Sequence, residues 1–177
     1  MTIEIKQITA DNKADINIKN EPFKLRGRMK PHLVSGVWSY ETELFPESEM
    51  GEMTFPDENY SFESMSDEHI FVGAYDGASC VGLAILRHSW NRYLYLYDLK
   101  VNSAVRGHGI GKRLIEVSAK IARELGYNGI YTQAQDNNLT ACLFYLNTGF
   151  VIGGCDTMVY DGTNQAGKID ILFYRPN

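Results

Sequence analysis

Arg-Gly-His-Gly-Ile-Gly-Lys, at residues 106–112, is the stretch that decides the fold of this chain. A run typical of a β-strand precedes it at residues 93–101, and an amphipathic helical run follows it to about Leu125. The three glycines allow turn conformations that are closed to other residues, and no Cβ keeps a ligand at a distance. The unpaired N–H groups at the start of the helix, with its positive dipole end, favour an anion. Strand, glycine turn and helix in this order predict a pyrophosphate site.

The spacing of the glycines separates the families that bind phosphate in this way. A Walker loop needs G-x-x-x-x-G-K-[ST], but Arg113 follows Lys112 in this chain. The dinucleotide fingerprint G-x-G-x-x-G, counted from Gly107, meets Lys112 where its third glycine should stand. A glycine-rich turn without a ligand stays an alternative when the glycines are taken alone. The pattern that fits is R-x-x-G-x-G, filled by Arg106, Gly109 and Gly111.

A second motif follows about thirty residues later, with the sequence Asn138-x-x-Ala141-x-x-Phe144-Tyr145-x-x-x-Gly149-Phe150. The two motifs in this order resemble the GNAT superfamily of N-acetyltransferases, whose R-x-x-G-x-G loop holds the pyrophosphate of acetyl-coenzyme A. The resemblance is firm over residues 69–152 and weak before them. It implies an acetyl-CoA-dependent acyltransferase that acetylates an amine.

The hydrophobic patterns predict an α/β (α+β) fold with a GNAT-like mixed central sheet and helices on both of its faces. An antiparallel meander is followed by the order β-α-β-α-β-β. The expected strands are residues 2–8, 69–75, 79–88, 93–101, 129–135, 150–153 and 169–174. The expected helices are residues 10–20, 33–43, 61–66, 110–125 and 139–147, and the remainder of residues 23–65 is expected to be irregular. With 177 residues, the chain is predicted to form one domain, 1–177, with a substrate-pocket region at 20–68 and an acetyl-CoA core at 69–152.

The strand at residues 93–101 changes its apolar face along its length. Leu94 and Leu96 share one parity, whereas Leu99 and Val101 share the other. One extra residue, a β-bulge, would restore a single buried face, and a strand buried on both sides is the alternative. The GNAT resemblance implies a bulge here that frees backbone N–H groups for the thioester and the pantetheine arm.

Charge and composition exclude several classes of protein. A net charge of −5 argues against nucleic acid as the main partner, and no apolar run is long enough for a membrane span. The three cysteines are scattered, so they predict neither a disulfide framework nor a metal site, and free thiols in a cytoplasmic protein are expected. They are Cys80, Cys142 and Cys155.

Acidic residues gather between Lys30 and Arg87, where the sequence holds no Lys or Arg but eleven of its twenty-two Asp and Glu residues. Aromatic residues are interleaved with them, among them Trp38 and Tyr40. Carboxylates mixed with aromatic faces suit a cationic ligand, and a solvated acidic surface over core aromatics is the alternative. The predicted substrate-binding residues are Asp98, Glu68, Glu63, Trp38 and Tyr40.

The resemblance also implies roles for individual residues. Tyr145 is the predicted acid for the departing thiolate, with a core aromatic as the alternative, and Asn138 contacts pantetheine or caps a helix. Asp98 is the predicted group that holds the ammonium and accepts its proton, unless it only bonds N–H groups of the bulge. The predicted cofactor-binding residues are Leu99, Lys100, Val101, Arg106, Gly107, His108, Gly109, Ile110, Gly111, Lys112, Asn138 and Tyr145.

Within the superfamily, the chain resembles the streptothricin acetyltransferases of the bacillus type. The residues that carry this resemblance are the runs 71–75 and 95–102 and the acidic N-terminal half. It implies a cationic small-molecule substrate, acetylated on a β-lysine amine. The alternatives are an N-acetyltransferase for a protein N-terminus, a polyamine or an aminoglycoside, and a non-catalytic acetyl-CoA-binding module. Trp38, Trp90 and the Tyr-rich strand could form a homodimer surface.

Overall fold

The computed structural model describes residues 2–177, which fall into two compact units. The first unit contains residues 2–21, 55–130 and 176–177, and the second contains residues 22–54 and 131–175. Both units are therefore built from segments that lie far apart in the sequence. The predicted functional division into residues 20–68 and 69–152 stays a prediction.

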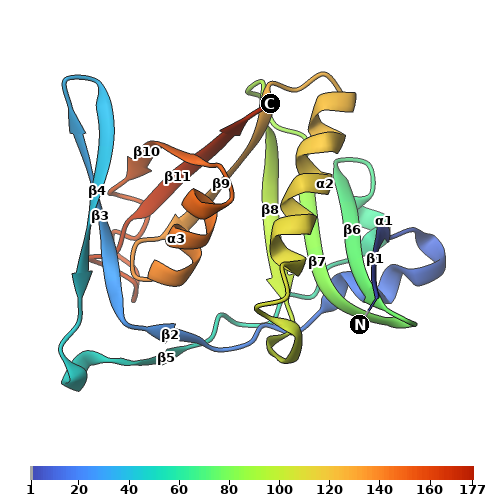
Figure 1. The fold of residues 1–177 in the computed structure, drawn as a ribbon, viewed down its shortest axis with the longest axis horizontal. Helices are drawn as coiled ribbons and strands as arrows, with labels where there is room; N and C mark the ends of the chain where they lie inside the picture. The colour runs from blue at the N-terminus through green and yellow to red at the C-terminus, as the bar shows by residue number, and fades with distance from the viewer. Residues whose placement is uncertain (1) are drawn as a thin grey trace. The chain divides into compact units, whose positions relative to one another are not determined.

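The first unit is built on a four-stranded antiparallel arrangement in the order β1 (Ile3–Gln7), β6 (His69–Asp76), β7 (Ser79–Arg87) and β8 (Leu94–Val101). The predicted meander is thereby confirmed, as is the position of the N-terminal strand at its edge. Two-residue periodicity explains the two faces, because successive side chains of a strand point to opposite sides. These strands and the helices beside them are drawn in Figure 1.

Helix α2 (Ile110–Glu124) covers one face of these strands. Its apolar residues recur at intervals of three and four, and Ile110, Leu114 and Ile115 are buried. A Cβ at Gly82 on β7 would lie 3.2 Å from Leu114 and 3.3 Å from Ile110, so the missing side chain lets the helix sit close to the strand. The face that carries Gly82 is therefore the face beneath α2.

The opposite face packs against the 3-10 helix η1 (Ala10–Asn17) and the short helix α1 (Phe62–Met65). Ile16 of η1 is fully buried in one cluster with Phe71, Leu83 and Ile85 of the strands, and Tyr60, Phe62 and Met65 pack against that cluster. Helices therefore cover both faces of the strands in this unit, as predicted.

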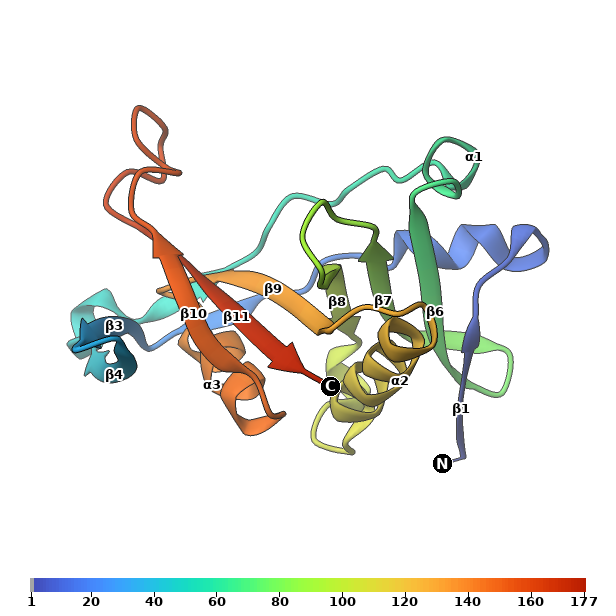
Figure 2. The same cartoon turned by 90° about the horizontal axis from the view of Figure 1, so that it is seen from above.

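The second unit contains residues 131–135 of β9 (Gly129–Gln135). Next to β9 lies β11 (Asp170–Pro176), and β10 (Val151–Asp156) is the outermost strand. Helix α3 (Leu139–Asn147) lies on one face of these strands, as Figure 2 shows. Two small antiparallel pairs complete the unit, β2 (Phe23–Leu25) with β5 (Gly51–Met53) and β3 (Gly27–Val34) with β4 (Val37–Leu44). The 3-10 helix η2 (Glu47–Glu49) precedes β5.

The prediction of a helix at residues 33–43 is wrong, because these residues form the end of β3 and most of β4. The two strands are joined by a two-residue turn in which Ser35 and Gly36 both have positive φ, 51° and 79°. Such a turn matches the twist of a hairpin. The region predicted to be irregular therefore contains four strands, β2 to β5. The short helix predicted at residues 61–66 is confirmed as α1.

Candidate functional site

The glycine loop joins β8 to α2 through a 3-10 turn, η3 (Ser103–Val105). Gly107 and Gly109 have φ values of +82° and +76°, a left-handed conformation in which a side chain would be strained. Gly109 is the N-cap of α2, and within residues 2–177 no side chain caps this helix start. A Cβ built at either glycine meets nothing within 4 Å, so the space beside the loop is open.

These features test whether the loop fits a pyrophosphate, and it does. The first turn of α2 contains no acidic residue, so its N–H groups keep their attraction for an anion. The helix has 15 residues, which is long enough for an appreciable dipole. The backbone of residues 107–112 therefore has the open space and the favourable helix start that a diphosphate requires.

Arg106 links the glycine loop to the end of β8 and to Glu21. Its Nε donates to the carbonyl of Val101, 2.9 Å away, and its guanidinium contacts Glu21 Oε2 at 3.1 Å. The same carboxylate accepts a 2.6 Å hydrogen bond from the N–H of Ser103. His108 Nδ1 lies 3.2 Å and 3.1 Å from the carbonyls of Val105 and Arg106. The loop is thus tied to the end of β8 before any ligand arrives.

The predicted β-bulge in β8 is confirmed. Asp98 pairs with Ile85 and Leu96 pairs with Leu86, so two partners adjacent on β7 face positions separated by Tyr97 on β8. The extra residue is Tyr97. Because of it, Leu94, Leu96, Leu99 and Val101 all fall on the face that α2 covers, although Leu99 and Val101 are only half-buried. Asp98 and Lys100 fall on the opposite face.

Asp98 lies in a cluster of polar side chains on that opposite face. Its Oδ2 accepts a hydrogen bond from the hydroxyl of Tyr60 at 3.1 Å and lies 3.2 Å from the ammonium of Lys100. Lys100 also bonds Glu58 and the carbonyl of Ile18, and its Nζ lies 5.6 Å from the centre of the Tyr60 ring. The cluster therefore already holds one alkylammonium, that of Lys100.

Burial sets the charge behaviour of this cluster. Loss of hydration raises the pKa of Asp98 above its usual value, and Glu58 adds to the effect while Lys100 opposes it. The hydroxyl of Tyr60 has its pKa raised by burial and by the neighbouring carboxylates, so it stays a donor. Neither Glu58 nor Tyr60 was predicted as a site residue. No local pattern points to them, because their partners lie about forty positions away in the chain.

Two of the other predicted substrate-binding residues, Glu63 and Glu68, lie in the same unit as Asp98. Glu63 is exposed and forms an ion pair with Lys13, which lowers its pKa. Glu68 is exposed, and its backbone carbonyl accepts a bond from the N–H of His88 at 3.0 Å. Trp38 and Tyr40 lie on β4 of the second unit, where they pair with Leu33 and Pro31. Their part in binding stays a prediction.

The acid-rich window is more neutral than its sequence suggests. Cations from outside the window pair with several of its carboxylates: Lys30 and Arg28 with Glu43, Lys13 with Glu63, and Lys100 with Glu58. The segment is therefore not an uncompensated acidic surface.

The second motif builds α3 and its two ends. Asn138 is the N-cap, and its Oδ1 accepts a 3.2 Å hydrogen bond from the N–H of Ala141, so the predicted capping role is present. Tyr145 is 8% exposed, and its ring packs at 5.3 Å from Phe150 and 5.5 Å from Phe173. The aromatic packing offered as the alternative for Tyr145 is thus real, and it fixes the direction of the phenol.

Among residues 2–177, no three His, Cys, Asp or Glu side chains gather as a metal ion would require. In the same part of the chain, no helix is both long and apolar enough to cross a bilayer.

Comparison with known proteins agrees with the class that this fold and loop define. The family model described as "Acetyltransferase (GNAT) family" matches residues 33–150. The chain belongs to this family and is an acetyltransferase.

Streptothricin acetyltransferase A of Bacillus subtilis is 33% identical over 170 residues, which cover 96% of this chain and 98% of that enzyme. A protein from Bacillus anthracis provisionally named streptothricin acetyltransferase, solved in complex with acetyl coenzyme A, has a TM-score of 0.87 at 28% identity, covering 100% of this chain and 99% of its own. Nourseothricin acetyltransferase has a TM-score of 0.80 at 22% identity, with 99% of both chains covered, and shows the fold alone. The predicted mixed α/β fold and the predicted resemblance to the bacillus-type enzymes are confirmed.

Proposed function

We propose that this chain transfers the acetyl group of acetyl-CoA to an amine of a polycationic small molecule, namely the β-lysine amine of streptothricin. The observation that carries the donor is the glycine loop, with Gly107 and Gly109 left-handed at the open start of α2. The bound acetyl coenzyme A of the Bacillus anthracis protein supports the same donor. The choice of acceptor is supported by similarity to the Bacillus subtilis enzyme over nearly the whole chain.

The proposed cofactor site combines the loop with the strand before it. Backbone N–H groups of residues 107–112 bind the diphosphate, and Arg106 holds the loop in place. Leu99, Lys100 and Val101, which follow the bulge, offer backbone groups to the thioester and the pantetheine arm, with Asn138 as a further contact. Acetyl-CoA supplies the acetyl group as a thioester, which an amine can displace.

Tyr145 is proposed to supply a proton at its Oη to the thiolate that leaves. A phenol is well suited to this role because it is neutral at pH 7 and has one proton to give. Its ring is held between Phe150 and Phe173, so the hydroxyl does not have to be ordered at the moment of reaction.

Asp98 is proposed to hold the acceptor's ammonium and to take its proton. A lysine-type amine has a pKa of about 10.4, so only about one molecule in a thousand is neutral at pH 7. A carboxylate whose pKa is raised by burial is a better proton acceptor than an ordinary one. Its present partners are Lys100 and Tyr60, so an incoming ammonium would share Asp98 with them.

The substrate is tested by offering acetyl-CoA with streptothricin, kanamycin, spermidine or an Ala-started peptide, and by measuring the free thiol released. Saturable turnover of streptothricin at the lowest KM is expected. Turnover of the peptide without turnover of streptothricin would refute the proposed acceptor and leave the donor intact. No thiol with any amine, and no binding of acetyl-CoA by calorimetry, would refute the enzyme itself.

Two substitutions test the proposed roles. Asp98→Asn should lower kcat/KM by about 10²- to 10⁴-fold, with the largest loss at low pH, where the neutral amine is scarcest. Tyr145→Phe should lower kcat by about 10²-fold or more while the KM for acetyl-CoA changes little. Asp67→Asn, at an exposed position, and Tyr127→Phe, at a half-buried position where the hydroxyl contacts His88, lie outside the proposed site and are the matched controls. Wild-type kinetics in either test variant would remove that residue from the mechanism.

We also propose a cytoplasmic location, which is supported by Cys80, Cys142 and Cys155 remaining free thiols. A homodimer stays a prediction. Of the residues named for its surface, Trp90 is 95% exposed.

A further inference from the structure

The face of the second unit that lies opposite α3 carries a buried polar group that the proposed chemistry does not use. On β11, Ile171 and Phe173 point toward α3, since Phe173 packs against Tyr145 of that helix. Asp170 has the other parity and therefore points away from α3. Figure 2 shows α3 on one side of β10 and β11, with the loop between these strands beyond their ends.

Asp170 accepts a hydrogen bond from a tyrosine on this face. Tyr160, from the loop between β10 and β11, donates its hydroxyl proton to Asp170 Oδ1 at 2.7 Å. The side chain of Gln135, at the end of β9, lies close enough to the Tyr160 hydroxyl to lower its pKa, although burial raises that pKa overall. Asp170 is 4% exposed and Gln135 is 8% exposed. The three side chains therefore form one cluster, in which Asp170 and Gln135 are buried and Tyr160 is half-buried.

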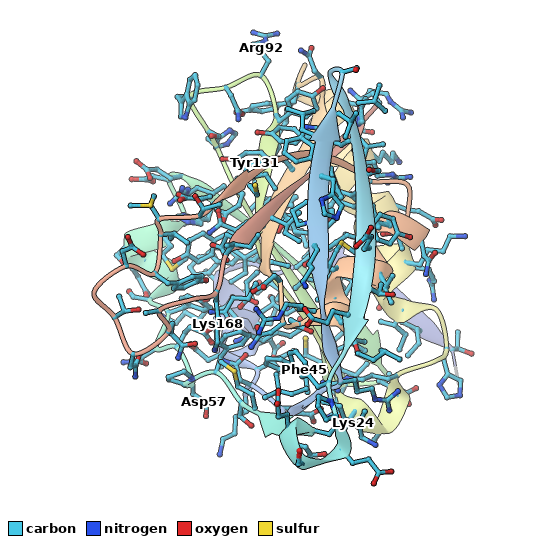
Figure 3. The ribbon with its side chains drawn as sticks, turned by 90° about the vertical axis from the view of Figure 1, so that its left-hand side faces the viewer. Lys24, Phe45, Asp57, Arg92, Tyr131 and Lys168 are labelled. Carbon is cyan, nitrogen blue, oxygen red and sulfur yellow. The ribbon has the colours of Figure 1, made fainter. Side chains whose placement is uncertain are left out.

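The charge around this group is not balanced. Burial raises the pKa of Asp170, the hydrogen bond from Tyr160 opposes this rise, and the nearby carboxylates Asp156 and Asp136 add to it. Arg28 faces Asp136 at 3.9 Å, and within residues 2–177 no ion pair reaches Asp170. Lys168, labelled in Figure 3, is turned toward Gln165 and the sulfur of Met53 instead. Negative charge therefore exceeds positive charge at a buried position.

A second and independent observation is an acceptor atom that lacks a donor. Gln135 Oε1 is buried, and in the described part of the chain nothing donates to it. Asn137, two residues further on and 6% exposed, has a buried Oδ1 in the same state. Buried polar atoms of this kind cost free energy unless a partner satisfies them. The Gln135 oxygen, which lacks a donor and belongs to a side chain beside Tyr160 and this excess negative charge, calls for a ligand that is cationic and can donate an N–H.

Aromatic rings extend along the same face. Tyr131 of β9 and Tyr174 of β11 stack with their ring centres 5.3 Å apart and their planes 14° apart. They share strand parity with Gln135 and Asp170, respectively. A Cβ at Gly153 would lie 2.4 Å from the Tyr174 ring, so this glycine gives the ring its room on β10. The faces of aromatic rings attract cations. The stacked rings of Tyr131 and Tyr174 therefore add a cation-attracting surface on the face of the strands that carries Asp170.

We propose that Asp170, with Gln135 and Tyr160, is a subsite that binds a second cationic group of the acceptor, an ammonium or a guanidinium. Asp170 supplies the counter-charge and Gln135 Oε1 accepts an N–H, while Tyr160 keeps the carboxylate in position. The inference rests on the proposed function, because it assigns a binding place to the part of a polycation that is not acetylated. The subsite selects acceptors that carry more than one positive charge.

The experiment compares Asp170→Asn with wild type on two acceptors, streptothricin and a monoamine of one positive charge. The substitution keeps the shape of the side chain, and the amide oxygen of Asn can still accept a hydrogen bond from the Tyr160 hydroxyl. We expect the KM for streptothricin to rise about 10- to 100-fold, because a charge-assisted hydrogen bond is lost. The KM for the monoamine, the KM for acetyl-CoA and the kcat at saturation should change less than about twofold. Asp161→Asn, at an exposed position of the same loop, is the control.

Calorimetry with spermidine in the absence of acetyl-CoA gives a readout that does not need turnover. Wild type should bind spermidine more tightly than Asp170→Asn and Gln135→Leu, and Asp161→Asn should match wild type. Equal binding by all four proteins would overturn the proposal and leave ordered water as the partner of Gln135. An equal rise in KM for streptothricin and for the monoamine would also overturn it. If wild type acetylated no acceptor but its binding of spermidine were still weakened by Asp170→Asn, the proposed function would be refuted and the cation site would remain supported.

Discussion

Asp98 in the first unit and Asp170 in the second each accept a hydrogen bond from a tyrosine hydroxyl, yet the charges of the two aspartates are balanced differently. Asp98 in the first unit accepts from Tyr60 and is neutralised by Lys100, from its own strand. Asp170 in the second unit accepts from Tyr160, and within residues 2–177 no ion pair neutralises it. The counter-charge of Asp98 is therefore part of the fold, whereas a counter-charge for Asp170 has to come from outside the chain.

The largest effect is expected where the fold supplies the counter-charge. Lys100→Met leaves Asp98, whose side chain is 14% exposed, and the more exposed Glu58 without their cation, and the side chain of Lys100 is only 8% exposed. Removing one partner of such a pair costs about 3–5 kcal/mol, because the remaining charge stays desolvated. Urea unfolding measures this loss.

The control for this substitution is Lys120→Met on α2, whose partner Glu124 lies 3.8 Å away and whose side chain is 73% exposed. It should cost less than about 0.5 kcal/mol. Equal losses in the two variants would mean that Lys100 is hydrated and that the two aspartates do not differ in the way described.

A smaller effect is expected from the two tyrosines. Tyr60→Phe should cost about 1 kcal/mol, because Asp98 keeps Lys100 as a partner. Tyr160→Phe should cost about 2 kcal/mol, because it removes the donor that reaches Asp170 Oδ1 and no cation takes its place. Thermal and urea unfolding of both variants test the order. The reverse order would contradict the view that Lys100 shares the stabilisation of Asp98.

The smallest effect concerns pH. Because the pKa of Asp170 is raised by burial, the folded state holds its proton to higher pH than the unfolded state does. The stabilisation by this group is complete below the ordinary pKa of an aspartate, and it is lost as the pH rises through the raised value.

Asp170→Asn removes this dependence, so its free energy of unfolding relative to wild type should increase with pH across that window, by less than about 1 kcal/mol. Unfolding measured at several pH values checks the sign. A difference that stays constant with pH would mean that Asp170 titrates normally.

The sequence predicted the elements that have strong local signals. The glycine loop, the bulge at residues 96–99, the strands of the meander and the helix at residues 139–147 all follow from periodicity and from residues with special backbone conformations. The hairpin of β3 and β4 had such a signal too, in Ser35-Gly36 between apolar pairs, but the prediction placed a helix across it. That error came from reading the period of side chains and overlooking the turn.

The polar clusters could not be predicted, because their members come together only through the tertiary fold. Glu58 meets Lys100 from 42 positions away, and Asp170 meets Gln135 through a loop residue, Tyr160. A count of charges along the chain made residues 31–86 look uncompensated, although Lys13, Lys30 and Lys100 pair with acids in that window. Sequence patterns record neighbours along the backbone, and ion pairs depend on neighbours in space.

The bulge at Tyr97, the additional residue of β8, also decides on which face of the strand two charged side chains lie. With it, Asp98 and Lys100 face η1, whereas the leucines and valine of the same strand face α2. If Tyr97 were paired with β7 as an ordinary strand residue, without the bulge, the two sets would exchange sides, and an ammonium and a carboxylate would lie in the hydrocarbon beneath the helix. The face of each ion therefore depends on the bulge absorbing one residue, and a strand without Tyr97 would present the same side chains on the same faces through regular alternation.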